Sequence, residues 1–310
     1  MEENDEQTES ALLKAYNAIM TLIPGFSEYL LAMPRHSIAA LIHEMQDICN
    51  RARGDDTHLL RNLVLVAILD DPLTDRLNPP LLESDPKVRR GINHPQFARQ
   101  IVPFAVYDDL VDEATHDATI AGMQKGTIKI NDDSLSMIFW APKERDPDDE
   151  EQGMGRNPLL VRLYRGLWLG KTKAYAAPSS VPRGCNAQAH GHLRVTAESI
   201  AYVAMQARFA CSAVTDWKLA DGDWTMQAFY KNIIEALYLD EDDPDEWAEE
   251  TLRWWNTEIF GKPEGAEEET IAADEKEASH ELKNCRSKRE ARAAKRAAAR
   301  RAKAAQAAVV

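Results

Sequence analysis

The stretch TAESIAYVAMQARFAC, residues 196–211, predicts a helix more clearly than any other part of this 310-residue chain. Thr196 is a residue type that caps helix N-termini, and Glu198 stands in the first turn, where the helix dipole favours a negative charge. Apolar side chains then recur at helical spacing and give one face: Ile200, Val203, Ala207, Cys211 and Val214. Because this is the pattern of a core helix, we expect a mainly helical fold around it.

Two further helices are expected downstream of this stretch. The first begins near Asp223, and its buried face is Phe229, Tyr230, Ile233, Ile234 and Leu237. The second begins with Asp243 as its cap and Pro244 in its first turn, where a proline fits, and it ends before Gly261. Its core face is formed by Trp247, Leu252, Trp255 and Ile259. The helical body is therefore expected to end at residue 262.

Upstream, three helices are expected before residue 70. They run over residues 8–23 with Thr8 as cap, from Ser37 to Gly54, and over residues 59–69. Gly54 stands in the usual place for a glycine just past a helix end. The middle helix has an apolar stripe formed by Ile38, Leu41, Ile42, Met45 and Ile48.

The middle third carries weaker patterns. Helices are expected over residues 97–102, 107–121 and 159–169, short strands over 127–130 and 137–140, and a surface loop at the acidic run 146–151. The predicted fold class is mainly α: a single helical domain over residues 11–262, with at most a few short strands in the middle third. Residues 1–10 are expected to be a disordered acidic N-terminus, and residues 263–310 a charged tail, acidic and then basic, that is helical or disordered.

The composition excludes several classes of protein. With 44% hydrophobic residues the chain can bury a core, which excludes a wholly disordered chain. The four cysteines, at positions 49, 185, 211 and 285, are too scattered for a disulfide scaffold or a four-cysteine zinc site. The longest apolar run, residues 63–69, is far shorter than the about 18 residues of a membrane span, so no membrane association is expected. The acidic start is unlike a secretory or mitochondrial leader, which predicts an intracellular protein.

The charge of the chain is divided between a body and a tail. Residues 283–310 hold ten Lys or Arg and one Glu, so the formal net charge of −14 leaves −23 on residues 1–282. Basic clusters of this kind are typical of nuclear-import signals or nucleic-acid contacts, since each cation can neutralise a phosphate. The residues expected to make such contacts are Lys288, Arg289, Arg292, Lys295, Arg296, Arg300 and Arg301. The alternative is a solvated tail whose charge offsets the acidic segment before it.

Few residues carry a recognisable chemistry. Cys185, His190 and His192 form one short cluster of metal-ligand types, but zinc sites usually pair two such clusters, so a hydrogen-bonded turn is favoured over a metal centre. Gly170-Lys171-Thr172 resembles the end of a phosphate-binding loop, yet Arg165 stands where the pattern requires glycine. The chain carries no nucleophile elbow and no dinucleotide-binding fingerprint. These residues do not support an enzyme, and no cofactor is expected.

Several segments, in order, resemble a domain-of-unknown-function family of mushroom-forming (basidiomycete) fungi. They are Leu22-Ile23-Pro24-Gly25-Phe26, Arg90-Gly91-Ile92-Asn93-His94-Pro95, Ala98-Arg99, Val102-Pro103, Cys185-Asn186-Ala187, Val195-Thr196, Ile200-Ala201-Tyr202, Gln206-Ala207-Arg208, Phe229-Tyr230, Trp254-Trp255-Asn256 and Phe260-Gly261. The likeness spans most of residues 12–262 and implies a helix-rich fungal protein with no assigned activity. It singles out His94, His190 and Arg208 among the polar residues, whereas His192 departs from the family pattern.

These observations leave three hypotheses for the function. The first is a nuclear interaction protein, otherwise cytoplasmic, whose acidic helical body docks an unknown protein partner and whose basic tail serves import or nucleic-acid contact. The second is an enzyme or small-ligand-binding domain with a polar site at His94, Arg99, His190 and Arg208, which requires these side chains to converge in one cleft. The third is a transposon-linked accessory protein, which the many-copy habit of the family suggests.

Overall fold

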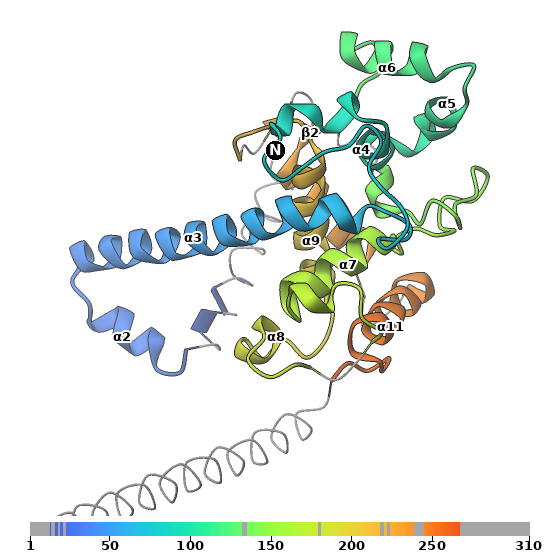
Figure 1. Cartoon of the computed structure of the whole chain (residues 1–310). Coiled ribbons are helices and arrows are strands. Elements are labelled where there is room, and N and C mark those ends of the chain that lie inside the picture. Colours follow the sequence, from blue (N-terminus) through green and yellow to red (C-terminus); the bar gives the residue numbers. More distant parts are fainter. Residues whose placement is uncertain are drawn as a thin grey trace, which may run out of the picture. The chain divides into compact units, whose positions relative to one another are not determined.

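The protein is mainly helical, as the sequence predicts (Figure 1). The computed structural model describes residues 23–131, 135–178, 181–217, 220–221, 224–238 and 245–266, together with residues 13, 16, 17, 19 and 20. The chain divides into two units, residues 1–55 and residues 56–310. Each unit is considered by itself below.

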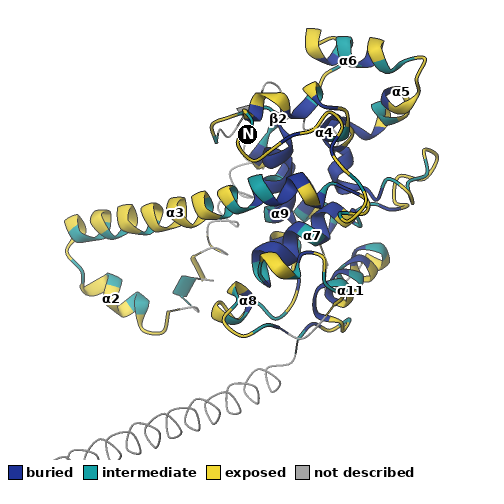
Figure 2. Cartoon of the chain, in the orientation of Figure 1, coloured by how far each residue is buried: buried dark blue, intermediate teal, exposed yellow. Residues whose placement is uncertain are grey.

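The described residues of the first unit form no buried interior. Its helix α2 (Phe26–Ala32) begins after Gly25, and none of the residues of α2 is buried. The five described residues between 13 and 20 are helical, in agreement with the helix predicted there, whereas Thr8 lies outside the described residues. No described residue before position 56 is buried, as the predominance of exposed positions in Figure 2 shows.

Helix α3 (Arg35–Ala67) corrects the prediction of two separate helices in this region. It begins directly after Pro34, two residues before Ser37, and it passes through Gly54 without a break. A glycine ends a helix by adopting a positive φ, and Gly54 does not do so. A glycine inside a helix costs only about 1 kcal/mol relative to alanine, so the good helix formers around it carry the helix onward.

The second unit contains the hydrophobic core. Besides the last part of α3, its α-helices are α4 (Pro95–Ile101), α5 (Tyr107–Val111), α6 (His116–Lys125), α7 (Pro158–Trp168), α8 (Asn186–Ala189), α9 (Ala197–Cys211), α10 (Met226–Ala236) and α11 (Glu246–Phe260). Short 3₁₀ turns occur at Lys87–Arg89, Gly91–Asn93, Phe104–Val106, Met137–Phe139 and Lys171–Lys173. Asp112 and Thr115 lie in the turn that divides the predicted helix 107–121 into α5 and α6.

Helix α9 is the centre of this core. It packs against α4, α7 and α10, and 11 of its 15 residues are buried. Alanines alternate with the larger apolar residues around the helix, which lets neighbouring helices approach it from several sides. Thr196 caps it as predicted: its hydroxyl accepts from the Ser199 N–H at 3.2 Å, and the Ser199 hydroxyl accepts from the Thr196 N–H at 3.0 Å.

The strand predictions for the middle third are wrong. Residues 137–139 form a 3₁₀ turn, and residues 127–130 form no strand. All three residues of the turn are buried, and a short apolar run buried on every side does not distinguish a strand from a turn. The described strands are instead β1 (Ala220–Asp221) and β2 (Trp224–Thr225), which pair antiparallel in a small hairpin before α10.

Two smaller expectations also bear on described residues. The cap of α11 is Asp245, because its side chain accepts from the Ala248 N–H at 3.1 Å, and not Asp243, which lies outside the described residues. The acidic run 146–151 is a surface turn, as predicted. Within the described part of the chain, no helix combines the length and the apolar character that crossing a bilayer requires.

Candidate functional site

The structure separates the four polar residues that the sequence grouped. The larger of two described cavities is lined by Arg99, and the smaller by Arg208, whereas His94 and His190 line neither. His94 is 1% exposed, and its Nε2 lies 2.7 Å from the Pro79 carbonyl oxygen. Burial lowers the pKa of His94, so this imidazole is a neutral core group. His190 is exposed at the end of α8.

Arg208 is a buried core residue that also borders the smaller cavity. It is 2% exposed, and its guanidinium carbon lies 4.8 Å from the ring centre of Trp224. A guanidinium over an indole face is a favourable cation–π contact. This stacking gives the buried guanidinium of Arg208 an aromatic partner within the core.

The side chains of Cys185, His190 and His192 do not form a group of metal ligands in the part of the chain that the structure describes. No group of three or more metal-ligand side chains converges among the described residues. His192 stacks on Trp168 with ring centres 4.2 Å apart, and its Nε2 is hydrogen-bonded to the Tyr164 hydroxyl. Burial lowers the pKa of His192, which fits a neutral imidazole within an aromatic cluster.

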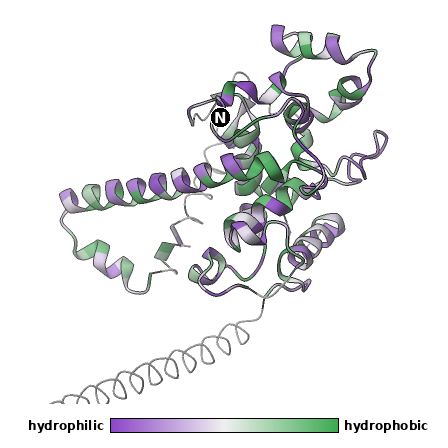
Figure 3. Ribbon diagram, in the orientation of Figure 1, coloured by the Kyte–Doolittle hydropathy of each residue, from purple (hydrophilic) through white to green (hydrophobic). Residues whose placement is uncertain are grey.

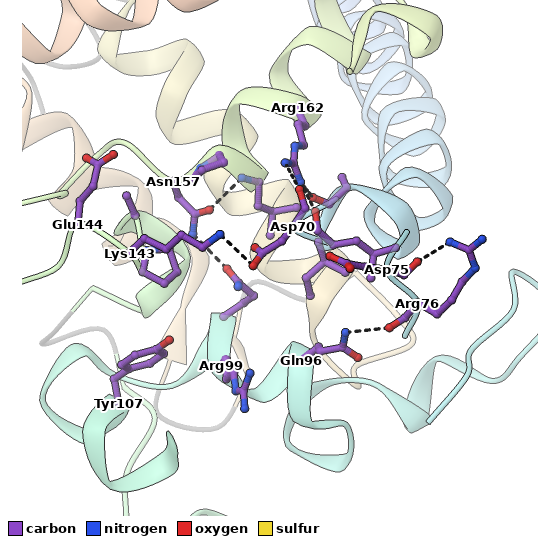
Figure 4. Close-up of a pocket in the computed structure, with 18 residues that line it drawn as sticks. Asp70, Asp75, Arg76, Gln96, Arg99, Tyr107, Lys143, Glu144, Asn157 and Arg162 are labelled. Atoms are coloured by element: carbon purple, nitrogen blue, oxygen red, sulfur yellow. Dashed lines mark hydrogen bonds and ion pairs between the residues drawn. The ribbon is translucent and has the colours of Figure 1, made fainter. Parts of the chain in front are cut away.

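The larger cavity is the candidate binding site in the second unit (Figure 4). Its volume is about 560 Å³, within the range of small-molecule sites. The wall is built from the end of α3 and the turn after it (residues 67–76), helix α4, Tyr107 on α5, residues 141–144 and the start of α7. Its polar and charged side chains are Asp70, Asp75, Arg76, Gln96, Arg99, Gln100, Tyr107, Lys143, Glu144, Asn157 and Arg162.

Arg162 holds the end of α3 and the following turn in place at one side of the cavity. From α7 it donates to the carbonyl of Ala67, which ends α3 without a helical partner, and to the carbonyls of Leu69 and Asp70 in the turn that follows. The following turn is closed by Asp71, whose carboxylate accepts from the Leu73 N–H at 2.8 Å. That hydrogen bond lowers the pKa of Asp71. The pair Asp70-Asp71 therefore serves the turn that ends α3 rather than acid–base chemistry.

Asn157 connects the two helices of the cavity wall, α4 and α7. Its Oδ1 caps α7 by accepting from the Leu159 N–H at 2.9 Å, and its Nδ2 donates to Oε1 of Gln100 at 3.1 Å. Both amide side chains are nearly inaccessible to solvent, so these bonds hold α4 and α7 in a defined relation at the cavity.

Arg99 differs from the other cations of the cavity. Arg162 is committed to three carbonyls, Arg76 donates to the carbonyls of Leu73 and Asp75, and Lys143 forms an ion pair with Asp70 at 3.1 Å. Among the described residues, the exposed Arg99 guanidinium has no hydrogen bond or ion pair. A charge without a partner at the rim of a cavity is available to a ligand.

The sequence singles out Arg99 but not the groups that surround it in the cavity. Tyr107, Lys143, Asn157 and Arg162 come from segments up to 55 positions apart, and no local spacing joins them. The only local signals were the turn at Asp70-Asp71-Pro72 and the proline that follows Asn157, which marks a helix start. Their convergence depends on tertiary contacts.

A second candidate site is an apolar surface in the first unit. We define the α3 seam as Ile38, Leu41, Met45, Ile48 and Ala52, which alternate at spacings of three and four residues. None of these residues is buried, and Ile48 is 52% exposed. Figure 3 shows hydrophobic positions recurring along this otherwise hydrophilic part of α3.

The fold and these sites define a mainly helical protein with a polar cavity in one unit and an exposed apolar helix face in the other. A model of the family of unknown function DUF6698 matches residues 47–260, and the chain therefore belongs to that family. Neither a curated protein nor a solved structure matches the chain at a significant level. The family match contains the whole cavity but begins within the α3 seam.

Proposed function

We propose that the protein is an interaction protein that pairs with a second copy of itself along the α3 seam. The observation that carries this proposal is an apolar helix face in a unit that buries none of its described residues. In proteins, most of the stability of an amphipathic helix comes from packing of its apolar face rather than from helix propensity. The face therefore needs a partner, and on this proposal the partner is the same chain.

The spacing of the seam supports a coiled-coil partner. Steps of three and four residues over 38–52 are those of heptad positions a and d. Ile, Leu, Met and Ile occupy the first four positions, and the small Ala52 closes the seam. Two such seams are complementary to each other without any further element.

The charges beside the seam support a second copy. Glu44 and Arg51 lie on the same flank, are both about 70% exposed, and approach each other to 3.8 Å. In an antiparallel pair this flank faces itself, so Glu44 of one chain would lie opposite Arg51 of the other. Residues 35–55 hold three Arg and three Asp or Glu, so this segment is neutral in an otherwise strongly acidic body and does not repel its copy.

The test is the oligomeric state of the full chain by sedimentation equilibrium at micromolar concentration. We expect a dimer for the wild type and a monomer for Leu41→Glu, because a carboxylate cannot be buried unpaired at the centre of the seam. Ala39→Glu adds the same charge to the exposed outer face and should remain dimeric. A monomeric wild type, or a dimer that Leu41→Glu leaves intact, would refute the proposal.

We also propose that the basic tail provides nuclear import or phosphate contact, which rests on the +9 charge of residues 283–310. The −23 body should repel nucleic acid unless the tail extends clear of it. A salt titration of binding to a labelled DNA duplex, comparing the full chain with residues 1–262, tests direct contact. Tail-dependent binding should weaken with a log–log slope of about −0.9 per phosphate neutralised. Nuclear accumulation that survives removal of residues 283–310 would contradict the import role.

A further inference from the structure

We infer that the larger cavity binds a small organic monocarboxylate, with Arg99 as the residue that pairs with the carboxylate. This site is independent of the α3 seam, because every residue of its wall lies in the second unit. The inference rests on unused donors, on the charge balance of the wall and on its apolar part.

Three hydrogen-bond donors of the wall have no acceptor among the described residues. They are the Arg99 guanidinium, the Tyr107 hydroxyl and the Nε2 group of Gln100. The Oε1 atom of Gln100 already accepts from Asn157, and this bond fixes the amide so that its donor side remains available. Burial raises the pKa of Tyr107, which keeps the phenol protonated and able to donate. Clustered donors with one unpaired cation are suited to an oxyanion.

The charge balance of the cavity wall favours a ligand that carries a single negative charge. Four cations and three carboxylates line the cavity, and the cations other than Arg99 are held by backbone carbonyls or by Asp70. One uncommitted cation matches one carboxylate, and the planar guanidinium fork fits its two oxygens. A phosphate dianion would meet the same guanidinium but also the nearby Asp70, Asp75 and Glu144 carboxylates, which would repel its second charge.

The apolar part of the wall favours a ligand that also has an apolar, organic group. Its apolar side chains come from the end of α3, from the segment before α7 and from α7 itself: Ala67, Ile68, Leu69, Ala141, Pro142, Pro158 and Leu159. A cavity of about 560 Å³ is far larger than a bare inorganic ion needs. The combination of apolar wall and donor cluster fits an aromatic or branched carboxylic acid.

The experiment uses 4-fluorobenzoate as the probe and the full chain as the protein. Fluorine NMR line broadening reports binding, and 4-fluorobenzamide is the uncharged probe of the same shape. We expect fluorobenzoate to bind, fluorobenzamide to bind at least about tenfold more weakly, and inorganic phosphate to displace neither, because the charge-assisted pair with Arg99 supplies the selectivity.

The variants locate the site. Arg99→Gln should weaken fluorobenzoate binding about tenfold or more, and Arg99→Lys should restore part of it, since a lysine keeps the charge but loses the fork. The control is Arg253→Gln, which removes an exposed arginine of α11 outside the cavity and should bind as the wild type does. Thermal unfolding of each variant checks that it is folded. Absence of fluorobenzoate binding, equal binding of the benzamide, displacement by phosphate, or full binding by Arg99→Gln would each overturn the inference.

Discussion

Lys87 is the residue whose ionisation the fold perturbs most clearly. It is 2% exposed, and its ammonium group lies 3.4 Å from the centre of the Phe209 ring. Its Nζ donates to the Val214 carbonyl and, at 3.4 Å, to the Ser212 hydroxyl, but no described carboxylate pairs with it. Burial, assisted by the nearby charge of Arg90, lowers the pKa of Lys87 to about 7. In the folded protein the buried Lys87 side chain is therefore mostly an uncharged amine at slightly alkaline pH.

This perturbation predicts a pH-dependent stability that Lys87→Met should abolish. Above pH 7 the folded state releases the Lys87 proton, while the unfolded chain keeps it up to about pH 10.5. Because the unfolded state then binds more protons, the stability contributed by this site rises with pH, with a slope that approaches about 1.4 kcal/mol per pH unit. Between pH 7 and 8.5 the wild type should gain on the order of 1–2 kcal/mol relative to Lys87→Met.

The measurement is urea unfolding of both proteins at several pH values in this window. The window stops below the pKa of an ordinary thiol, because burial raises the pKa of Cys211 to about 12 and its ionisation in the unfolded chain would act in the opposite direction. His94 and His192, whose pKa values burial lowers, titrate below the window. The exposed Lys125→Met is the control and should follow the wild type. Parallel pH profiles for Lys87→Met and wild type would contradict the prediction.

The sequence singled out polar residues that the structure places in defined environments, but it did not predict which of them belong to the core and which line a cavity. Arg99, His94 and Arg208 all occupy defined environments, but only Arg99 faces the larger cavity with an unpaired charge. Whether a histidine or arginine is a core group or a site group depends on what covers it. That is decided by residues such as Pro79 and Trp224, which no spacing rule connects to them.

Two glycines within helices differ in how much space surrounds them. Gly54 is exposed inside α3, and a Cβ at this position would have no atom within 4 Å, whereas a Cβ on Gly166 of α7 would collide with Cδ2 of the buried Leu63. Gly54→Ala should therefore strengthen α3 locally by about 0.5–1 kcal/mol. Gly166→Ala should destabilise the protein by about 1–3 kcal/mol, since the packed core cannot accept the added methyl group.

Hydrogen exchange and urea unfolding distinguish these two effects. Slower amide exchange around residue 54, with little change in global unfolding, is the expected signature of Gly54→Ala. Gly166→Ala should lower the global unfolding midpoint instead. Faster exchange around residue 54 in Gly54→Ala would show that α3 needs a flexible break there, as the sequence pattern had suggested.

A periodic apolar face predicted that a helix exists better than a cap residue predicted where it begins or ends: α7 was found although no cap was predicted for it, whereas the helix expected from Ser37 to Gly54 has neither of those bounds. Helix α9 has Thr196 as the predicted cap and a long apolar pattern, but it ends at Cys211, three residues before Val214, the last residue of the predicted face. The predicted break at Gly54 failed because a glycine is only a permissive stop signal, which a 33-residue helix can override. The segment 137–140 failed because burial on all sides removes the alternation that identifies a strand.

At the scale of the whole molecule, the two units differ in what stabilises them. Among the described residues, every buried apolar side chain lies at Leu60 or beyond, and the family match ends at residue 260, close to the end of that core. The first unit contributes exposed helix faces instead. We therefore expect that the second unit folds without the first, and that the first unit is needed only for association.

Removal of residues 1–55 should leave the stability of the second unit unchanged within about 1 kcal/mol while abolishing dimer formation. The shortened chain keeps the whole core and two hydrogen bonds that anchor the remaining part of α3, from Thr57 to Gln206 at 3.0 Å and from Tyr202 to Asp56 at 2.7 Å. All seven tryptophans lie beyond residue 55, so their fluorescence during urea unfolding reports this unit in both proteins. Sedimentation equilibrium reports association in the same samples, with Leu41→Glu as the full-length monomeric control. A shortened chain that remains dimeric would move the interface away from the α3 seam, and one that loses several kcal/mol would show that the first unit is part of the folded core.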